Sequence, residues 1–193
     1  MEQNWQKKSD EDLARQVQNG NTQLFGLIVD RYETKIGRYA KKFVYDQDDI
    51  KDVLQEIFIK AYVNIKSFDT ARKLSPWIYR IAHNELVNTL RKKKKNTLPL
   101  FNLDTFLPRG FSENEINKEN DHRDVKQMIN TCLAALEPKY KEPTILYYLD
   151  ELSYSEISEI LQIPISTVGV RIKRAREKMQ KAYLTQKKYE QGK

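Results

Sequence analysis

Hydroxyl-bearing and basic side chains gather on one face of a helix predicted near the C-terminus. The stretch 152–179 reads LSYSEISEILQIPISTVGVRIKRAREKM. Val168, Ile172 and Ala175 recur at helical spacing and predict the buried face of this helix. The opposite face then presents Ser166, Thr167, Val170, Arg171, Lys173 and Arg174. Such hydroxyls and cations suit base edges and phosphate oxygens, so the face predicts contact with DNA.

Two helices joined by a short turn are predicted to position this face. Ser153 followed by Glu156 is a capping box that starts the first helix. Pro164 in the turn stops the first helix and suits the start of the second. This is the arrangement of a helix-turn-helix, whose second helix enters the major groove. The alternative from periodicity alone is a helical hairpin with a solvated basic face.

A second polar group lies on another predicted helix, which Asp46 can cap. The apolar stripe of this helix is Ile50, Val53, Leu54, Ile57, Phe58 and Ala61. Asp52, Gln55 and Glu56 lie off that stripe and are expected to face solvent. Paired carboxylates can do acid–base chemistry, but no nucleophile or metal ligand accompanies these. We therefore expect no enzyme activity and no small-molecule substrate.

Composition limits the function classes. The chain of 193 residues carries a net charge of +7, so a polyanionic partner is plausible. One cysteine, Cys132, excludes an internal disulfide, and with only two histidines a metal site is not expected. Six glycines form no phosphate-binding pattern, so we expect no nucleotide cofactor. No apolar run is long enough for membrane insertion, and the expected location is the cytoplasm.

Charge and helical periodicity divide the chain into blocks. The net charge is +6 over residues 1–95, −3 over 96–125 and +4 over 126–193. Apolar residues recur at three- and four-residue steps in both basic blocks, and no stretch shows sustained strand alternation. The expected fold is all-α, with two small helical domains joined by a flexible linker. The boundaries are an N-terminal domain over 1–95, an acidic linker over 96–124, a helix-turn-helix domain over 125–185 and a polar tail over 186–193.

Two prolines and the cysteine bear on the remaining elements. Ser75 and Pro76 predict a helix start with serine as the cap, and that helix runs into the cations of 91–95. Pro143 would remove a backbone donor inside a helix starting at Pro138, so a kink or a later start is expected there. Cys132 belongs to an apolar stripe and is expected in the core.

Three segments together resemble a known family. The stretch LSYSEISEILQIPISTVGVRIKRAR is similar to the C-terminal domain of extracytoplasmic function (ECF) sigma factors, a group within the sigma-70 family. The segment DVLQEIFIKAY, residues 52–62, resembles that family's polymerase-binding helix. The segment SPWIYRIAHNELVNTLRKKKK, residues 75–95, resembles the helix behind the loop that recognises the −10 element. The resemblance covers about residues 10–95 and 125–183, in the family's order.

The resemblance implies a bacterial transcription initiation factor that binds core RNA polymerase and directs it to promoter DNA. It implies that Asp52, Gln55 and Glu56 dock on the polymerase, where carboxylates suit arginines of a partner helix. The loop 64–75 would capture a flipped base, with cations along the strand and aromatic faces for stacking. The residues expected at the −10 element are Lys66, Arg72, Lys73, Trp77, Tyr79, Arg80 and Asn84. The aromatic side chains, Trp77 among them, have core packing as the alternative.

The resemblance also implies contacts upstream and at the −35 element. Upstream phosphates would meet Arg91, Lys92, Lys93, Lys94 and Lys95. The −35 element would be read by Ser166, Thr167, Val170, Arg171, Lys173 and Arg174. Gly169 departs from the family, which commonly has a basic residue there, so an altered readout is expected. An anti-sigma factor is a further expected partner. The alternatives are a dimeric helix-turn-helix regulator and a helical adaptor.

Overall fold

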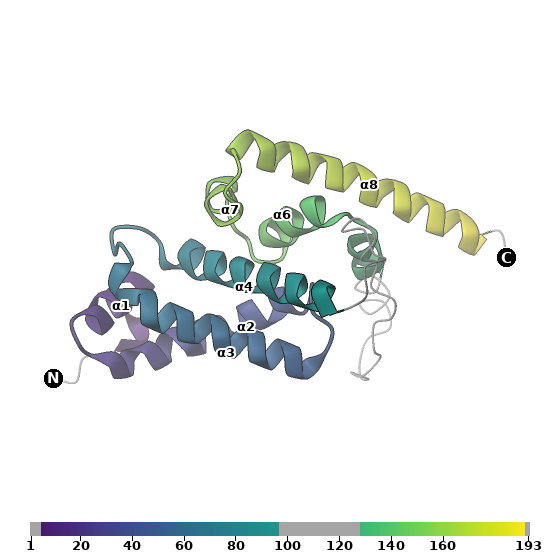
Figure 1. The fold of residues 1–193 in the computed structure, drawn as a ribbon. Helices are drawn as coiled ribbons and strands as arrows, with labels where there is room; N and C mark the ends of the chain where they lie inside the picture. Colours follow the sequence, from purple (N-terminus) through teal and green to yellow (C-terminus); the bar gives the residue numbers. More distant parts are fainter. Residues whose placement is uncertain (1–4, 97–127, 192–193) are drawn as a thin grey trace. The chain divides into compact units, whose positions relative to one another are not determined.

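The protein is helical throughout the part of the chain that the structure describes. The computed structural model describes the backbone of residues 5–96 and 128–191 (Figure 1). It contains no strand within those ranges, which confirms the expected all-α class. The described residues fall into two compact units, residues 5–96 with 156–162 and residues 128–155 with 163–191. The linker expected over 96–124 lies, apart from Asn96, outside the described residues.

The N-terminal segment, residues 5–96, consists of helices that follow one another with short turns. Its elements are η1 (Trp5–Lys7), α1 (Asp10–Gln18), η2 (Thr22–Leu24), α2 (Phe25–Ala40), α3 (Gln47–Asn64), η3 (Ile65–Ser67) and α4 (Leu74–Asn96). Helices α3 and α4 pack side by side, α2 packs on α3, and α1 lies against η3 (Figure 1). This packing leaves one side of α3 and the turn after it at the surface.

Side-chain caps define where two of these helices begin. Ser9 precedes α1 and its hydroxyl accepts a hydrogen bond from the Asp12 amide at 3.1 Å. Asp46 precedes α3, and its carboxylate accepts hydrogen bonds from the amides of Asp48 and Asp49 at 3.0 and 3.1 Å. These bonds satisfy donors that a helix start leaves without intrahelical partners. The prediction that Asp46 caps a helix is confirmed.

The core of the N-terminal segment combines apolar side chains from α1, α2, α3 and α4. Its largest fully buried side chains include Leu13, Ile28, Ile36, Tyr39, Ile57, Leu74, Ile78 and Tyr79. The rings of Tyr39 and Tyr79 meet edge to face, with their centroids 5.6 Å apart. Tyr32 donates a hydrogen bond to Asp10 at 2.6 Å and so joins α2 to α1. Burial, and after it this bond, raises the pKa of Tyr32 far above the ordinary tyrosine value.

The C-terminal segment, residues 128–191, is also helical. Residues 128–134 form a helix, followed by α6 (Pro138–Tyr148), α7 (Tyr154–Leu161) and α8 (Ile165–Gln191). Helices α6 and α8 pack together and bury Ile145, Leu146, Val168 and Ile172. Cys132 is buried, as predicted. Gln162, with a φ of 54°, lies in the left-handed region that ends helices and leads into the turn before α8.

Two local predictions need correction. Helix α4 begins at Leu74, so Ser75 lies inside its first turn and is not the cap. The Leu74 amide is bound instead by the Glu11 carboxylate, which supplies the acceptor expected from serine. Helix α6 begins at Pro138 and continues through Pro143, so the later start is wrong. Pro143 and the three residues after it are buried, and this packing compensates for one missing backbone bond.

Helix α8 continues to Gln191, so the backbone is helical across the boundary expected at residue 185 between the helix-turn-helix domain and the polar tail. In the ranges that the structure covers, no helix combines the length and apolar composition needed to cross a bilayer.

The cap at Asp46 gives a stability prediction. We expect Asp46→Ala to lower the free energy of unfolding of the N-terminal segment by about 1 kcal/mol, because two amide donors of α3 lose their acceptor. Both tryptophans, Trp5 and Trp77, lie in this segment, so urea denaturation followed by tryptophan fluorescence reports on it selectively. Asp46→Asn retains an acceptor oxygen and should keep most of the stability. An equal loss in both variants would contradict a capping role.

Candidate binding surfaces

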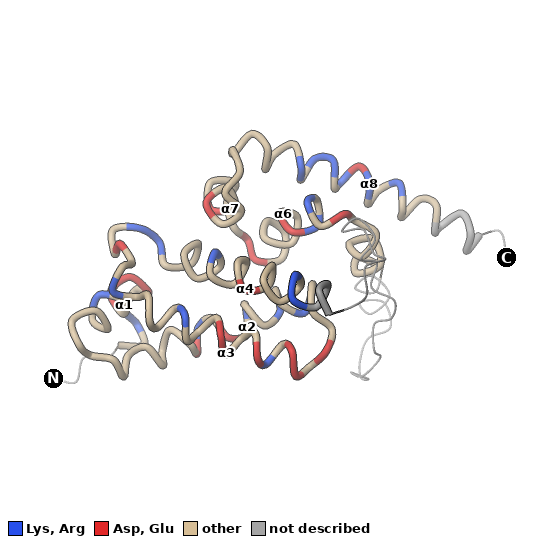
Figure 2. The backbone as a smooth tube through the Cα atoms, in the orientation of Figure 1, with Lys and Arg blue, Asp and Glu red and all other residues tan. Residues whose placement is uncertain are grey.

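The exposed face of α3 carries the predicted polar set. Asp52, Gln55 and Glu56 are all exposed, as expected from their place off the apolar stripe. The opposite side of the helix is buried through Ile50, Val53, Ile57 and Ala61. Acidic residues cluster in the first half of α3 (Figure 2), where the positive end of the helix dipole favours them. The structure therefore brings the three predicted residues together on one accessible face.

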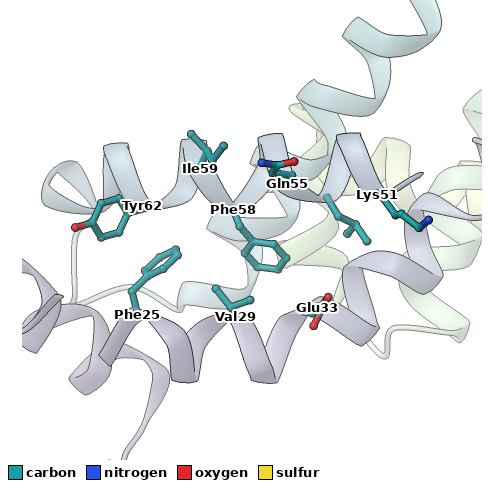
Figure 3. A pocket seen from close by; sticks show the side chains of 9 residues that line it. Phe25, Val29, Glu33, Lys51, Gln55, Phe58, Ile59 and Tyr62 are labelled. Carbon is teal, nitrogen blue, oxygen red and sulfur yellow. The ribbon is translucent and has the colours of Figure 1, made fainter. Parts of the chain in front are cut away.

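An open apolar pocket lies beside this face, between α2 and α3 (Figure 3). Its lining residues are Phe25, Val29, Glu33, Lys51, Leu54, Gln55, Phe58, Ile59 and Tyr62. The rings of Phe25 and Tyr62 meet edge to face with centroids 5.1 Å apart, and Ile59 is 47% exposed. Gln55 belongs both to the pocket and to the polar face. An apolar pocket with a charged rim is a surface suited to a protein partner.

Sequence analysis did not predict this pocket. Leu54 and Phe58 were assigned to the buried stripe of α3, but both are only half-buried and line the pocket. The sequence did carry a signal for the pocket. The apolar stripe of α3 covers more of the helix circumference than the contact with α2 and α4 requires, which indicates that part of the stripe is accessible.

The loop after α3 presents the predicted cations. Lys66, Arg72 and Lys73 are exposed, while Phe68 is buried with 6% exposure. The half-buried Trp77 packs against Phe68 with ring centroids 5.2 Å apart. Arg72 and Lys73 form ion pairs with two glutamates of α7 at 3.0 and 2.9 Å, and the aromatic contact lies beneath the exposed cations.

The remaining −10 candidates, which lie on the first turns of α4, differ in their exposure to solvent. Arg80 and Asn84 are exposed. Tyr79 is only 2% exposed and packs against Tyr39, so the structure places its ring in the core and not on the surface with the other candidates. The sequence did carry a signal for this, because Tyr79, Ala82 and Leu86 follow one another at steps of three and four residues and all three are buried.

The end of α4 carries the basic run. Arg91 and Lys92 are exposed, and the helix continues to Asn96. The side chains of Lys93, Lys94 and Lys95 lie outside what the structure describes, although their backbone is helical.

Helix α8 separates an apolar face from a basic one. Val168, Ile172 and Ala175 are at most 3% exposed, as predicted. On the other side Ser166, Val170, Lys173 and Arg174 are exposed, and Thr167 and Arg171 are half-buried. Lysine and arginine are frequent along the middle of α8 (Figure 2). All six predicted residues therefore lie on the accessible side of one helix.

A tyrosine packs on the flank of α8 at its glycine. A Cβ added to Gly169 would lie 3.4 Å from Cε2 of Tyr154, at ordinary contact distance. Tyr154 in turn meets Tyr147 edge to face, with centroids 5.1 Å apart, and both rings are partly exposed. The Tyr154 ring therefore covers the backbone of α8 beside the basic face, at a distance that an alanine side chain would also fit. Sequence analysis identified the glycine but not the tyrosine that covers it.

Metal chemistry finds no support in the described side chains. No group of three or more His, Cys, Asp or Glu residues among them could hold an ion. Burial raises the pKa of the Cys132 thiol, so this side chain is mostly protonated at neutral pH.

Comparison with known proteins defines the family. The model described as Sigma-70 region 2 matches residues 28–96, and the model described as Sigma-70, region 4 matches residues 126–179. The ECF RNA polymerase sigma factor SigW of Bacillus subtilis is 37% identical over 177 residues, which cover 86% of this chain and 92% of that protein. The ECF RNA polymerase sigma-E factor of Escherichia coli is 33% identical over 175 residues, covering 88% and 91%.

Solved structures support the fold. The structure of CnrH in complex with the cytosolic domain of CnrY is similar with a TM-score of 0.68 and 24% identity, covering 91% of this chain and 97% of that one. The sigma factor RpoE of Bartonella quintana, solved with the anti-sigma factor NepR, has a TM-score of 0.63 and 20% identity, covering 83% and 96%.

The chain belongs to the sigma-70 family of RNA polymerase sigma factors, in its extracytoplasmic function group. The predicted class, a transcription initiation factor, is confirmed, and the dimeric helix-turn-helix regulator is not favoured. The relatives are sigma factors and not enzymes.

The contact at Gly169 gives a prediction for α8. We expect Gly169→Ala to stabilise α8 against local opening by about 1 kcal/mol, because alanine has the higher helix propensity and its Cβ meets Tyr154 at contact distance. Amide hydrogen exchange of α8 measures this free energy. In a Tyr154→Ala background, Gly169→Ala should still stabilise α8 through the higher helix propensity of alanine, but without the contribution of the contact with the ring. Faster exchange in Gly169→Ala would show that the ring has to move.

Proposed function

We propose that this sigma factor holds core RNA polymerase through the exposed face of α3, reads the −10 element with the loop 65–73 and the start of α4, and reads the −35 element with α8. The observation that carries the proposal is the division of α3 and α8 into a buried apolar face and an exposed functional face. On both helices, the residues predicted to bind polymerase or DNA are therefore accessible to a partner.

The α3 surface combines two kinds of contact for the polymerase. Asp52 and Glu56 can accept charge-assisted hydrogen bonds from arginines of a partner helix. The neighbouring pocket, with Phe25 and Tyr62 at one end, can bury apolar side chains of the same partner. Apolar burial would supply affinity, and the carboxylates would fix the orientation.

The loop surface is suited to single-stranded DNA. Lys66, Arg72 and Lys73 would follow the backbone of the separated strand, and Arg80 and Asn84 would extend the contact along α4. Trp77, half-buried behind Phe68, has an accessible part that could stack with a base. Tyr79 is left out of this surface because its ring is in the core. The cations from Arg91 to Lys95 would hold upstream phosphates without reading sequence.

The α8 surface is suited to the major groove. Arg171 and Arg174 can form bidentate bonds with guanine, while Ser166 and Thr167 at the helix start can bind phosphate oxygens. Val170, 49% exposed, offers an apolar contact for a thymine methyl group. Gly169 offers no side chain to a base, so base readout would depend on Arg171, Lys173 and Arg174.

Regulation by an anti-sigma factor also belongs to this proposal. The expectation follows from the family, and the α3 surface is accessible to an inhibitor as well as to the polymerase.

Removing the α3 carboxylates tests polymerase binding. We expect Asp52→Ala combined with Glu56→Ala to weaken binding to core polymerase at least about tenfold, because charged hydrogen bonds to the partner are lost. Binding is measured by titrating labelled sigma factor with core enzyme. The control variant Asp30→Ala with Glu177→Ala removes the same charge from exposed positions on α2 and α8. Unchanged affinity, or unfolding seen by tryptophan fluorescence, would contradict the proposed role.

Charge reversal on α8 tests promoter recognition. We expect Arg171→Glu with Arg174→Glu to reduce promoter binding by the holoenzyme by roughly tenfold per residue, with core binding unchanged. Lys35→Glu with Lys41→Glu changes the net charge equally on the N-terminal segment and serves as the control. Promoters selected from a random library by the wild-type holoenzyme provide the DNA. If both pairs reduce binding alike, α8 would contribute only general electrostatic attraction.

A further inference from the structure

We propose that α1 is a positioning element for promoter opening, because its side chains hold both ends of the loop 65–73 in one shape. The inference rests on the proposed role of this loop in capturing single-stranded DNA. Glu11, Arg15 and Gln18 lie four and three residues apart in α1, so they share one face of the helix. That face points at a loop that is 47 to 63 positions further along the chain.

Gln18 binds the first end of the loop. Its side-chain amide nitrogen donates to the carbonyl oxygens of Ile65 and Phe68, each at 2.7 Å. Both carbonyls follow the end of α3, and the Ile65 oxygen also accepts the Phe68 amide at 3.1 Å within η3. Gln18 is half-buried, and an amide nitrogen carries two hydrogens, so one side chain satisfies both acceptors.

Glu11 binds the second end. Its carboxylate accepts a hydrogen bond from the Leu74 amide at 2.9 Å, where α4 begins. A negative charge at the start of a helix also interacts favourably with the helix dipole. Between the two ends, Arg15 reaches the Thr70 hydroxyl at 3.4 Å, a long and exposed contact that adds little.

The loop completes its structure with its own bonds. The Asp69 carboxylate accepts from the Ala71 amide at 2.9 Å, and the Ser67 hydroxyl donates to the Asn64 carbonyl at 2.7 Å. Ile65 and Phe68 point inward, at 3% and 6% exposure. The inward anchors and the bonds from α1 leave the cationic side chains on the outer side of the loop, where two of them form ion pairs with glutamates of α7 at 3.0 and 2.9 Å.

The consequence is a loop already shaped before DNA arrives. Capturing a flipped base with such a loop requires no further ordering of its backbone, and this lowers the free-energy cost of capture. Residues of α1 need not touch DNA to have this effect. Loss of the Gln18 contact should therefore impair strand opening more than binding to duplex DNA or to polymerase.

The experiment compares Gln18→Glu with Gln16→Glu in the full chain. The first variant is nearly isosteric but has no donor, and its carboxylate would face two carbonyl oxygens. The second adds the same charge to α1 two positions away, on a different face. Hydrogen exchange of the 65–74 backbone amides reports the loop, and permanganate reactivity of promoter thymines reports opening by the holoenzyme.

Gln18→Glu should raise exchange of the 65–74 amides and lower promoter opening about tenfold, with core binding and −35 recognition retained. Glu11→Gln keeps an acceptor oxygen and should resemble wild type, whereas Glu11→Ala should not. Unchanged exchange in Gln18→Glu, faster exchange with normal opening, or an equal loss of core binding would each overturn the inference. If the wild-type chain opened no promoter with core enzyme, the proposed function would be wrong. The hydrogen-exchange measurement would still show whether α1 stabilises the loop.

Discussion

The rotation of each helix about its own axis determines what this sigma factor can bind. Burial of Ile50, Val53 and Ile57 fixes how α3 is turned, and the same burial leaves Asp52 and Glu56 on the outside. Val168 and Ile172 do the same for the basic face of α8. Apolar burial has no preferred direction by itself. On a helix with 3.6 residues per turn, however, burying the apolar stripe also fixes the direction in which every other side chain points.

Much of this arrangement could be predicted from the sequence, because helical periodicity is a local signal. The polar face of α3, the cap at Asp46 and the basic face of α8 follow from residues within a few positions of each other. Contacts between distant residues give no such signal. The amide of Gln18 and the carbonyl of Phe68 are 50 positions apart, and nothing in the sequence pattern pairs them. The early start of α4 was missed for the same reason, since the acceptor for its first amide comes from Glu11.

The departure from the family pattern at Gly169 has a structural counterpart in this chain. At Gly169 the bare backbone is covered by the Tyr154 ring, which is supported in turn by Tyr147. Ser166 and Lys173 lie three and four residues from Gly169, so they are its neighbours on the helix surface. The edge of the proposed −35 surface is thus partly aromatic where a basic side chain is common in the family. Promoter preference should differ from that of relatives mainly at bases facing this edge.

The single thiol has a practical value for studying the chain in motion. Cys132 is only 5% exposed, and burial raises its pKa, so little reactive thiolate is present at neutral pH. Cysteines introduced at exposed sites, such as Lys41 in one unit and Lys181 in the other, would react with maleimide dyes much faster than the native thiol. Energy transfer between two such dyes would follow the spacing of the two proposed promoter-reading surfaces during transcription initiation, with the native core left intact.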